Sequence, residues 1–221
     1  HLSETDVITR EPNGQWVAPR SLDLQTLPVS VREVIGHRVR RLGTDAEKIL
    51  AVAAVVGQYF DLELVAATAG VDEDRALDVL EHARRATLVT EVPDGGGRFA
   101  FHHALIQHTV YGGLSATRRQ RLHRRVAQTL EELCGEDLGE RVVELARHWG
   151  ATEVPTDASK AIHYASLAGD SAMSSLGPDK AVRYYRRALR AMDQAGGVDE
   201  RVRCQLKVSL GEAQRQTADS G

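Results

Sequence analysis

Residues 88–101, "LVTEVPDGGGRFAF", decide how the rest of the chain is interpreted. Before this stretch the apolar residues follow a helical period. Within it, the two runs that flank Pro-Asp-Gly-Gly-Gly follow a period of two, which is typical of strands with one buried face. Proline, aspartate and glycine between two such runs favour a turn. The stretch therefore predicts a β-hairpin inside a chain that is otherwise helical.

The segments before this hairpin predict helices. Residues 29–42 carry apolar side chains at helical spacing, and residues 45–56 are apolar on nearly all sides, as expected for a buried central helix. Thr44 and Glu47 have the spacing of a capping box at the start of that second helix. Gly57 is expected to end it.

Three more predicted helices complete a domain around the hairpin. A short helix is predicted over residues 61–69, and Asp72 is expected to cap a helix that runs to about residue 87. A helix over residues 102–114 follows the hairpin. Three helices, a β-hairpin and a further helix are the layout of a winged-helix domain, which we assign to residues 44–115.

The first 43 residues are interpreted as a hairpin and a linker helix. Residues 6–17 alternate on both sides of Asn13-Gly14, and Asn-Gly between two β-prone runs is the strongest short signal for a hairpin. Pro28 suits the first turn of the helix that follows, because its missing N–H has no partner to lose there.

Residues 116–221 predict helices only, and part of this segment follows a repeat pattern. A helix pair is predicted over residues 157–192, where small residues let the helices approach and an aromatic ring fills the gap, as in tetratricopeptide repeats. The residues that carry this spacing are Gly169, Ala181, Tyr185 and Ala188. Asp193 stands where the pattern expects a proline. Residues 206–219 resemble the first helix of a next repeat, with Gly211 equivalent to Gly169, so we expect a piece of a longer protein.

Composition indicates an ordinary globular protein. The 221 residues have a net charge of −3 and a sequence pI near 6.3, which gives no general attraction to nucleic acid or to an anionic membrane. Cys134 and Cys204 are too far apart in sequence for a Cys-x-x-Cys metal pair and too few for a disulfide framework. No apolar run approaches the ~20 residues that cross a bilayer. We therefore expect a cytoplasmic protein without a membrane segment.

The order of these segments along the chain resembles that in a known family, and this order is a more specific signal than any single motif. The resemblance rests on "LPVSVREVIGHRVRRL", "ILAVAAVVGQYFDLELVAATAG", "ALDVLEHARRATLV" and "RFAFHHALIQHTVYGGLSATRRQRLHRRVAQTLEEL", followed by the tetratricopeptide-like helices. This order is similar to the region after the AAA-like ATPase core of STAND proteins, the signal-transduction ATPases with numerous domains. It is most similar to large bacterial members with a LuxR-type DNA-binding domain or a cyclase domain. The resemblance implies that residues 1–43 end the ATPase module.

The resemblance also implies that ATP or ADP binds upstream of His1. No GxxxxGK[ST] motif occurs in this chain, and the glycines at 95–97 lead into Arg98 and Phe99 instead of a Lys-Ser or Lys-Thr. No catalytic constellation is evident. We therefore expect this fragment to hold no cofactor and to be no enzyme, while its parent protein is an ATPase.

Three histidines, His102, His103 and His108, raise the question of a chemical site. Their spacings of five and six residues do not place them on one helical face, which argues against a metal site. The resemblance implies a role for His103: in related proteins a histidine of the winged helix contacts the β-phosphate of bound ADP, and "FHHAL" is similar to that motif, with Ala104 in place of the acid. The remaining interpretation is an ordinary helix start.

Two arginine-rich helices are candidates for contact surfaces. The first set is Arg118, Arg119, Arg121, Arg124 and Arg125, which would contact nucleic acid or an acidic partner domain. The second set is Arg183, Arg186, Arg187 and Arg190, on the helix side opposite Ala181, Tyr185 and Ala188. For both we favour a solvated helix face, which is the usual meaning of such runs; Glu131 and Glu132 would balance the first.

In winged-helix domains that bind DNA, the third helix often lies in the major groove. In this chain it would present Asp74, Arg75, Asp78, Glu81, His82 and Arg85 outward if Ala76, Leu77, Leu80 and Ala83 face the core. More acids than arginines on this surface are a poor match for a phosphate backbone. We therefore expect no direct DNA binding by this fragment.

The sequence thus predicts a mainly α protein in which a winged-helix domain precedes a tetratricopeptide-like array. The expected function is regulatory: the chain would couple the nucleotide state of its own upstream ATPase domain to a helical sensor. That sensor would bind an inducer or a partner protein on the concave face of the repeats. Two alternatives stay open. One is a protein–protein interaction scaffold without nucleotide coupling, and the other is a DNA-binding regulator that acts through the winged helix.

Overall fold

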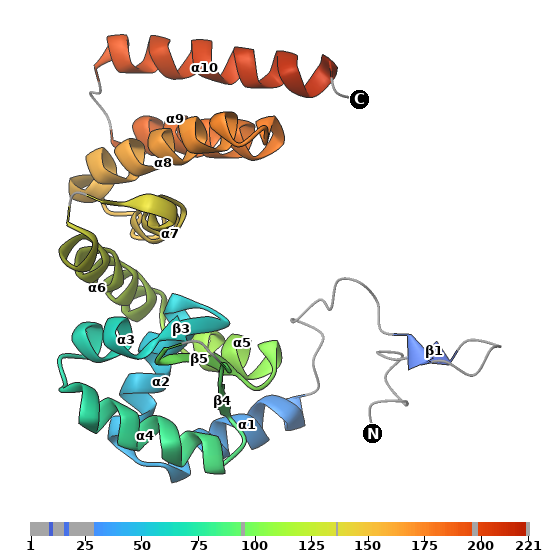
Figure 1. Cartoon of the computed structure of the whole chain (residues 1–221), viewed down its shortest axis with the longest axis vertical. Coiled ribbons are helices and arrows are strands. Elements are labelled where there is room, and N and C mark those ends of the chain that lie inside the picture. Colours follow the sequence, from blue (N-terminus) through green and yellow to red (C-terminus); the bar gives the residue numbers. More distant parts are fainter. Residues whose placement is uncertain are drawn as a thin grey trace.

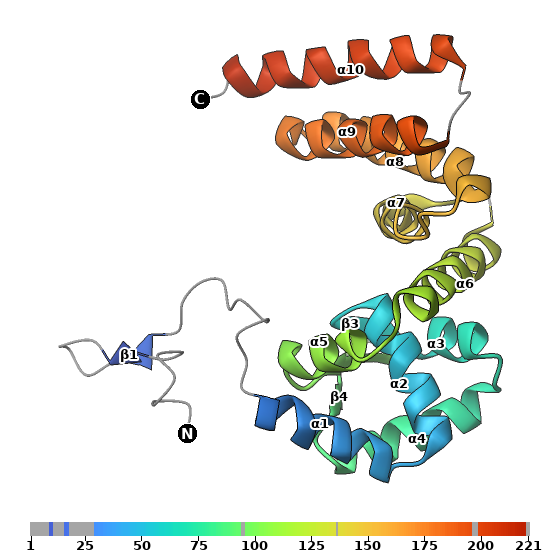
Figure 2. The ribbon, with the colours of Figure 1, turned by 180° about the vertical axis from the view of Figure 1, so that it is seen from behind.

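The computed structural model describes residues 9–10, 16–17, 29–93, 96–135, 137–195 and 199–219, and most of them are helical. The helices are stacked along one long axis, with α1 to α5 at one end and α10 at the other (Figures 1 and 2). The mainly α class predicted from the sequence is confirmed. Two small antiparallel sheets accompany the helices in these residues.

The first module contains five helices and a three-stranded sheet. Its helices are α1 (Val29–Arg41), α2 (Thr44–Val56), α3 (Leu62–Ala69), α4 (Glu73–Arg85) and α5 (Ala104–Gly112), and its strands are β3 (Tyr59–Asp61), β4 (Val89–Glu91) and β5 (Arg98–Phe101). The hairpin predicted over residues 88–101 is confirmed, because β4 and β5 pair antiparallel with Val89 opposite Phe101. Strand β3 was not predicted. It pairs with the other edge of β5, with Phe60 opposite Phe99, and the sheet order is β3-β5-β4.

The core of this module surrounds α2. Nine of its residues are buried, from Ala46 to Val56, so the central helix that the sequence predicted is confirmed. The capping box is wrong. Helix α2 begins one residue earlier, at Thr44, and Gly43 precedes it with φ 91 and no side-chain capping bond. The carbonyl of Gly43 accepts the N–H of Glu47, and a φ in the left-handed region at this tight entry favours glycine.

The other helix ends of the module follow the sequence closely. The Asp72 carboxylate accepts the backbone N–H of Arg75 at 2.8 Å, as expected for the cap of α4. Gly70 ends α3 in the left-handed region with φ 72. On α1, Ile35 and Val39 are buried against the core, whereas Val34 is exposed.

The predicted amino-terminal hairpin is present as two short paired strands, β1 (Thr9–Arg10) and β2 (Trp16–Val17). They are antiparallel, with Arg10 opposite Trp16. The turn at Asn13-Gly14 and the predicted start of the linker helix at Pro28 lie outside the described residues.

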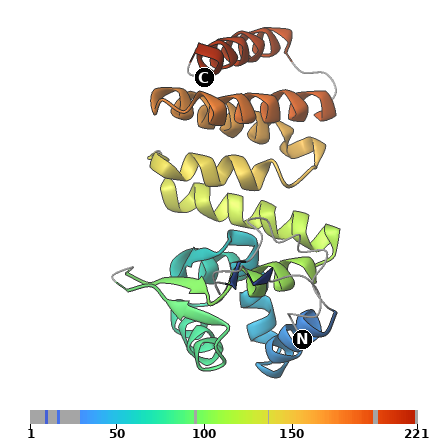
Figure 3. The same cartoon turned by 90° about the vertical axis from the view of Figure 1, so that its right-hand side faces the viewer.

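The second module is a stack of helices that continues from the first (Figure 3). Its elements are α6 (Ala116–Cys134), η2 (Gly139–Arg141), α7 (Val142–Trp149), η3 (Pro155–Asp157), α8 (Ala158–Ser174), α9 (Pro178–Ala195) and α10 (Glu200–Asp219). Each of the long helices packs on the next one along the chain.

The packing predicted for the helix pair is confirmed at its centre. Ala181, Tyr185 and Ala188 of α9 are buried, and the ring of Tyr185 lies against Gly169 of α8. The Tyr185 hydroxyl also donates to Asp170 at 2.7 Å. Gly211 of α10, the predicted equivalent of Gly169, is exposed and has open space where a Cβ would stand.

The two modules share one hydrophobic core. The largest cluster of buried side chains runs from α1 through α2 and α6 to α7 and α8, and it includes Leu145 and Trp149 of α7. A second cluster joins α8, α9 and α10 around Tyr185 and Met192. Helix α7 therefore contributes side chains to the core that joins the first module to the helix pair.

Candidate functional site

A pocket of about 990 Å³ opens beside α9, between this helix and the connection from α7 to α8. Its volume is at the upper end of the range for small-molecule sites, about 300–1,000 Å³. The walls come from the end of α7, the α7–α8 connection, the first turns of α8 and one face of α9. The lining residues are Trp149, Gly150, Thr152, Glu153, Val154, Pro155, Ala158, Ala161, Arg183, Tyr184, Arg186, Arg187, Arg190, Ala191 and Gln194.

One wall of the pocket is an arginine face. Arg183, Arg186, Arg187 and Arg190 line it together. They lie opposite the residues with which α9 packs on its neighbours, as the sequence predicted. The prediction that this face is simply solvated is wrong for Arg187, because its side chain is half-buried and lines a hollow. Sequence periodicity gives the face of α9 but not the connection that folds over it.

Arg187 occupies the inner position of this face. A Cβ on Gly150 would lie 2.9 Å from Cζ of Arg187, so the absence of a side chain at Gly150 lets the guanidinium cross over the end of α7. Its Nη2 donates to the backbone carbonyl of Arg147 at 3.2 Å. Burial lowers the pKa of Arg187, and the neighbouring cation Arg190 adds to the effect. The pocket therefore holds a charge that is poorly solvated and close to like charges.

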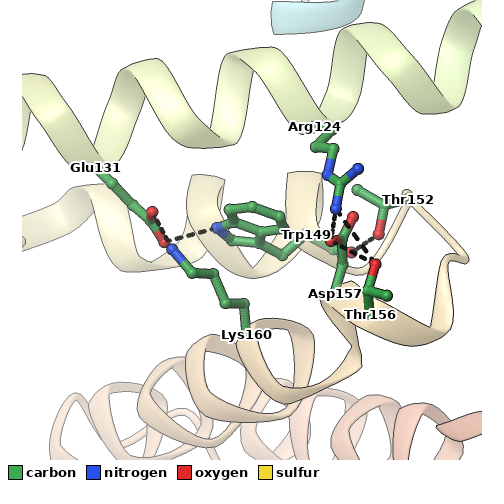
Figure 4. Close-up of polar contacts among 7 residues, drawn as sticks. All are labelled: Arg124, Glu131, Trp149, Thr152, Thr156, Asp157 and Lys160. Carbon is green, nitrogen blue, oxygen red and sulfur yellow. Dashed lines mark hydrogen bonds and ion pairs between the residues drawn. The ribbon is translucent and has the colours of Figure 1, made fainter.

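The opposite wall is held in place by a polar network between α6, α7 and α8 (Figure 4). The indole N–H of Trp149 donates to Glu131 of α6 at 3.0 Å. Lys160 of α8 forms an ion pair with the same carboxylate, and its ammonium lies 4.9 Å from the centre of the Trp149 ring. Glu131, which the sequence assigned to the balance of a solvated arginine run, is therefore a structural residue.

Asp157 fixes the connection itself. Its side chain is buried and forms an ion pair with Arg124 of α6, and Thr156 lies beside the same carboxylate oxygen (Figure 4). The Thr152 hydroxyl donates to the Trp149 carbonyl at 2.9 Å. These contacts give the pocket a fixed wall facing the arginines.

A second polar cluster is buried between α5, α6 and α7. His123 and His148 approach through their Nδ1 atoms at 2.9 Å, and His148 is fully buried. Arg147 lies 2.9 Å from Nε2 of His148, and the Tyr111 hydroxyl lies 3.0 Å from Nε2 of His123. Because a guanidinium only donates, the network assigns a proton to Nδ1 of His148 and to Nε2 of His123. Both rings are then neutral and both are satisfied.

The environment of this pair disfavours a positive charge. Burial lowers the pKa of His123 to about 4, with a further contribution from Arg147. Burial also places the pKa of His148 well below its ordinary value. The sequence predicted inter-helix packing for His148, which is confirmed, but it did not single out His123. No spacing in the sequence pairs residues on α6 and α7, so the pair is visible only in the fold.

Helix α7 contacts both modules through arginines. Arg147 donates to the carbonyl of Val56, at the end of α2, while its own carbonyl accepts from Arg187 of α9. Just before α7, Arg141 of η2 forms an ion pair at 2.6 Å with Asp61, at the end of β3. Hydrogen bonds thus lead from the pocket through α7 to the first module.

Of the three histidines singled out in the sequence, His102 and His103 precede α5 and His108 lies in its middle. All three are exposed. His103 precedes the first residue of α5 and makes no side-chain capping bond, and its ring lies against that of His102 at 4.6 Å between centres. No group of three or more potential metal ligands occurs among the described residues. The contact of His103 with a nucleotide stays a prediction.

The arginines of α6 differ in their surroundings, and their role as a contact surface stays a prediction. Arg124 is paired with Asp157, and Arg119 lies over the ring of Tyr111, 5.4 Å from its centre. Arg118, Arg121 and Arg125 are exposed.

The outer face of α4 is acidic in its first turn, at Glu73 and Asp74, and basic in its last turn, at Arg84 and Arg85. Both arginines predicted to face outward are engaged with carboxylates, Arg75 with Asp45 and Arg85 with Glu81. Leu77, expected in the core, is 36% exposed, and Val79 is buried instead. This face offers little to a phosphate backbone.

The buried histidine pair and the arginine-lined pocket differ in what they can do chemically. The histidine pair is sealed in the core, so it contributes to stability. The pocket combines guanidinium groups, which bind oxyanions through paired N–H donors, with an accessible hollow. It is the best candidate for a binding site in the described part of the chain.

Comparison with known proteins gives no match: no family model, no curated protein and no solved structure is similar to this chain. In the described residues, no helix combines the length and the apolar character that crossing a membrane requires.

Proposed function

We propose that the chain is a regulatory segment of a STAND-type ATPase signalling protein, and that it couples the nucleotide state of an upstream ATPase domain to a helical sensor. In this proposal residues 44–115 are a winged-helix domain. The order α2-β3-α3-α4-β4-β5 and the sheet order β3-β5-β4 support the assignment. The hairpin β4–β5 would be the wing.

The sensor in this proposal is the tetratricopeptide-like array of residues 116–221. Antiparallel neighbours with a small residue against an aromatic ring, as at Gly169 and Tyr185, support the repeat assignment. An inducer or a partner protein would bind to the array, and the pocket beside α9 is the surface that we favour. The output of the parent protein would be transcription or second-messenger synthesis.

The position of α7 is the observation that carries the proposal. A passive spacer would need contact with only its sequence neighbours. Instead, α7 contacts the end of α2 through Arg147, the preceding residue Arg141 of η2 contacts the end of β3, and α7 accepts a hydrogen bond from Arg187 of the pocket. A ligand that moves the arginine face would act on contacts that position the first module, which is what coupling between two sites requires.

The proposal is tested with the complete reading frame that contains this chain. We expect the purified protein to bind ADP and ATP, measured by isothermal titration calorimetry, and His103→Ala to weaken ADP binding about tenfold, the loss of one charge-assisted hydrogen bond. The matched control is His102→Ala, which removes the exposed neighbouring ring and should leave ADP affinity unchanged.

Two results would redirect the assignment. A complete protein that binds neither nucleotide would favour the scaffold alternative. Equal ADP affinities for wild type and His103→Ala would remove the nucleotide-sensing role of this histidine.

A further inference from the structure

Three arginines of the pocket lack the carboxylate partners that several other arginines in the described residues have. Elsewhere in the described residues, arginines on α4, α6, η2 and α10 form ion pairs with carboxylates. Within the part of the chain that the structure describes, no ion pair joins Arg183, Arg186 or Arg190 to a carboxylate. These side chains therefore form a concentrated positive charge with no internal compensation.

The remaining charge in the lining does not balance them. Glu153 is the acidic residue among the lining residues, and its carboxylate lies 3.4 Å from the amide nitrogen of Gln120 on α6. Four guanidinium groups thus face one carboxylate. Like charges gathered at a hollow repel one another, and a bound anion relieves that repulsion.

The floor of the pocket has a different character. Ala158, Ala161 and Ala191 supply small apolar surfaces there, and Tyr184 supplies an aromatic one. Trp149 also lines the pocket. Surfaces of this kind accept an apolar or planar group and make few demands on its hydrogen bonding. The pocket therefore combines one cationic side with one apolar side.

We propose that this pocket binds a small organic anion, with two or more negative charges at one end and a planar or apolar body. The charged end lies against Arg183, Arg187 and Arg190, and the body lies over the alanine floor. Phosphate and carboxylate groups are both recognised by guanidinium forks, so the ligand is a phosphorylated or a polycarboxylate molecule. The inference deepens the proposed function, on which it rests for its regulatory meaning, but the binding itself needs no ATPase domain.

A small ligand fits the site better than a macromolecule does. The lining comes from one corner of the array, from the end of α7 to α9, and includes no residue of α6 or α10. A peptide that bound along the array would contact successive repeats. The volume of about 990 Å³ corresponds to a molecule of drug or nucleotide size.

The test is calorimetric titration of the 221-residue chain at low salt with AMP, adenosine, pyrophosphate, citrate and an Asp/Glu-rich peptide. Adenosine has the planar body of AMP without its charge, and pyrophosphate has charge without a body. Comparison of citrate with pyrophosphate shows whether the pocket prefers carboxylate or phosphate groups. We expect saturable binding of AMP at millimolar concentration or below, weaker binding of pyrophosphate and citrate because both lack a planar body, and no binding of adenosine.

The variants locate the site. Arg183→Gln combined with Arg190→Gln removes two exposed pocket arginines, and we expect an affinity loss of at least about tenfold. The matched control combines Arg118→Gln with Arg121→Gln, two exposed arginines on α6 outside the pocket. It changes the net charge equally and should alter affinity by less than about twofold. Circular dichroism of both double variants checks that the helices are retained.

Four results would overturn the proposal. They are an equal loss in the control, binding of adenosine as tight as that of AMP, absence of saturable binding by AMP and citrate, and tighter binding of the acidic peptide than of either. The last would indicate a protein partner. None of these depends on nucleotide binding by the complete protein, so the two proposals fail separately.

Discussion

The ring of Tyr185 on α9 lies against the backbone of Gly169 on α8, so closely that a Cβ at this glycine would stand 2.7 Å from Cδ1 of the ring. Real Cβ atoms do not approach other atoms at this distance. The ring is also held from its other end, because its hydroxyl donates to Asp170. The helix pair therefore has no room for a side chain at Gly169.

This contact predicts that Gly169→Ala destabilises the protein. In a helix interior alanine stabilises the fold by about 1 kcal/mol relative to glycine. Overpacking against a fixed ring destabilises it by about 1–3 kcal/mol. We expect the free energy of unfolding in urea to fall by about 1 kcal/mol. Gly211→Ala is the control, since its site on α10 is open and exposed, and it should raise stability. Stabilisation by both substitutions would mean that the α8–α9 contact is looser than described.

The buried histidine pair predicts a loss of stability in acid. In the unfolded chain both imidazoles take up a proton near pH 6.5, whereas in the fold the pKa of His123 is about 4 and that of His148 is also lowered. Between these values the unfolded state binds more protons, so stability is complete above about pH 6.5 and is lost as the pH falls toward 4. His123 alone accounts for about 3 kcal/mol. Urea unfolding across this pH range measures the loss.

Two variants separate the effect of histidine protonation on stability from the effect of packing and hydrogen bonding. His148→Gln removes one buried imidazole and should make the pH dependence shallower. Tyr111→Phe removes the partner of His123 Nε2 and should lower stability by about 1 kcal/mol at every pH, with the dependence unchanged. A wild-type stability that stays constant from neutral pH to pH 4 would show that the pair is not neutral in the fold.

Asp157, in the connection between α7 and α8, and Asp45, on α2, each pair with an arginine. We expect the loss of these two ion pairs to have unequal effects on stability. Asp157→Asn leaves Arg124 without its ion-pair partner, and we expect a loss of about 2 kcal/mol in unfolding free energy. This is less than for a fully buried pair because Arg124 is partly exposed. Asp45→Asn breaks the exposed pair with Arg75, and should leave stability nearly unchanged. Similar losses in both would mean that Asp157 does not anchor the connection.

The elements that the sequence predicted well are those with a strong local signal. Asp72 and Gly70 have the chemistry that helix ends require, and the run around the triple glycine switches period abruptly. Strand β3 has only three residues between two helices, too few for a period to show. Its pairing with β5 depends on where the hairpin lies in space, so the third strand could not be predicted from local pattern.

The candidate site was harder to predict for the same reason. Arg187 and its neighbours were assigned correctly to one face of α9, but the pocket exists only because Gly150 and the α7–α8 connection pass over that face. The pairing of His123 with His148, on different helices, likewise follows from how α6 packs on α7. His102, His103 and His108, by contrast, are close in sequence but exposed in the fold.

Coupling of the pocket to the first module through α7 can be measured by hydrogen exchange with mass spectrometry. Arg187→Gln removes the hydrogen bond to the Arg147 carbonyl, and Arg190→Gln removes a neighbouring charge of the same pocket without that bond. We expect faster amide exchange over residues 53–61, at the end of α2 and in β3, for Arg187→Gln and not for Arg190→Gln. Exchange that changes only within α7 and α9, or equally in both variants, would contradict it.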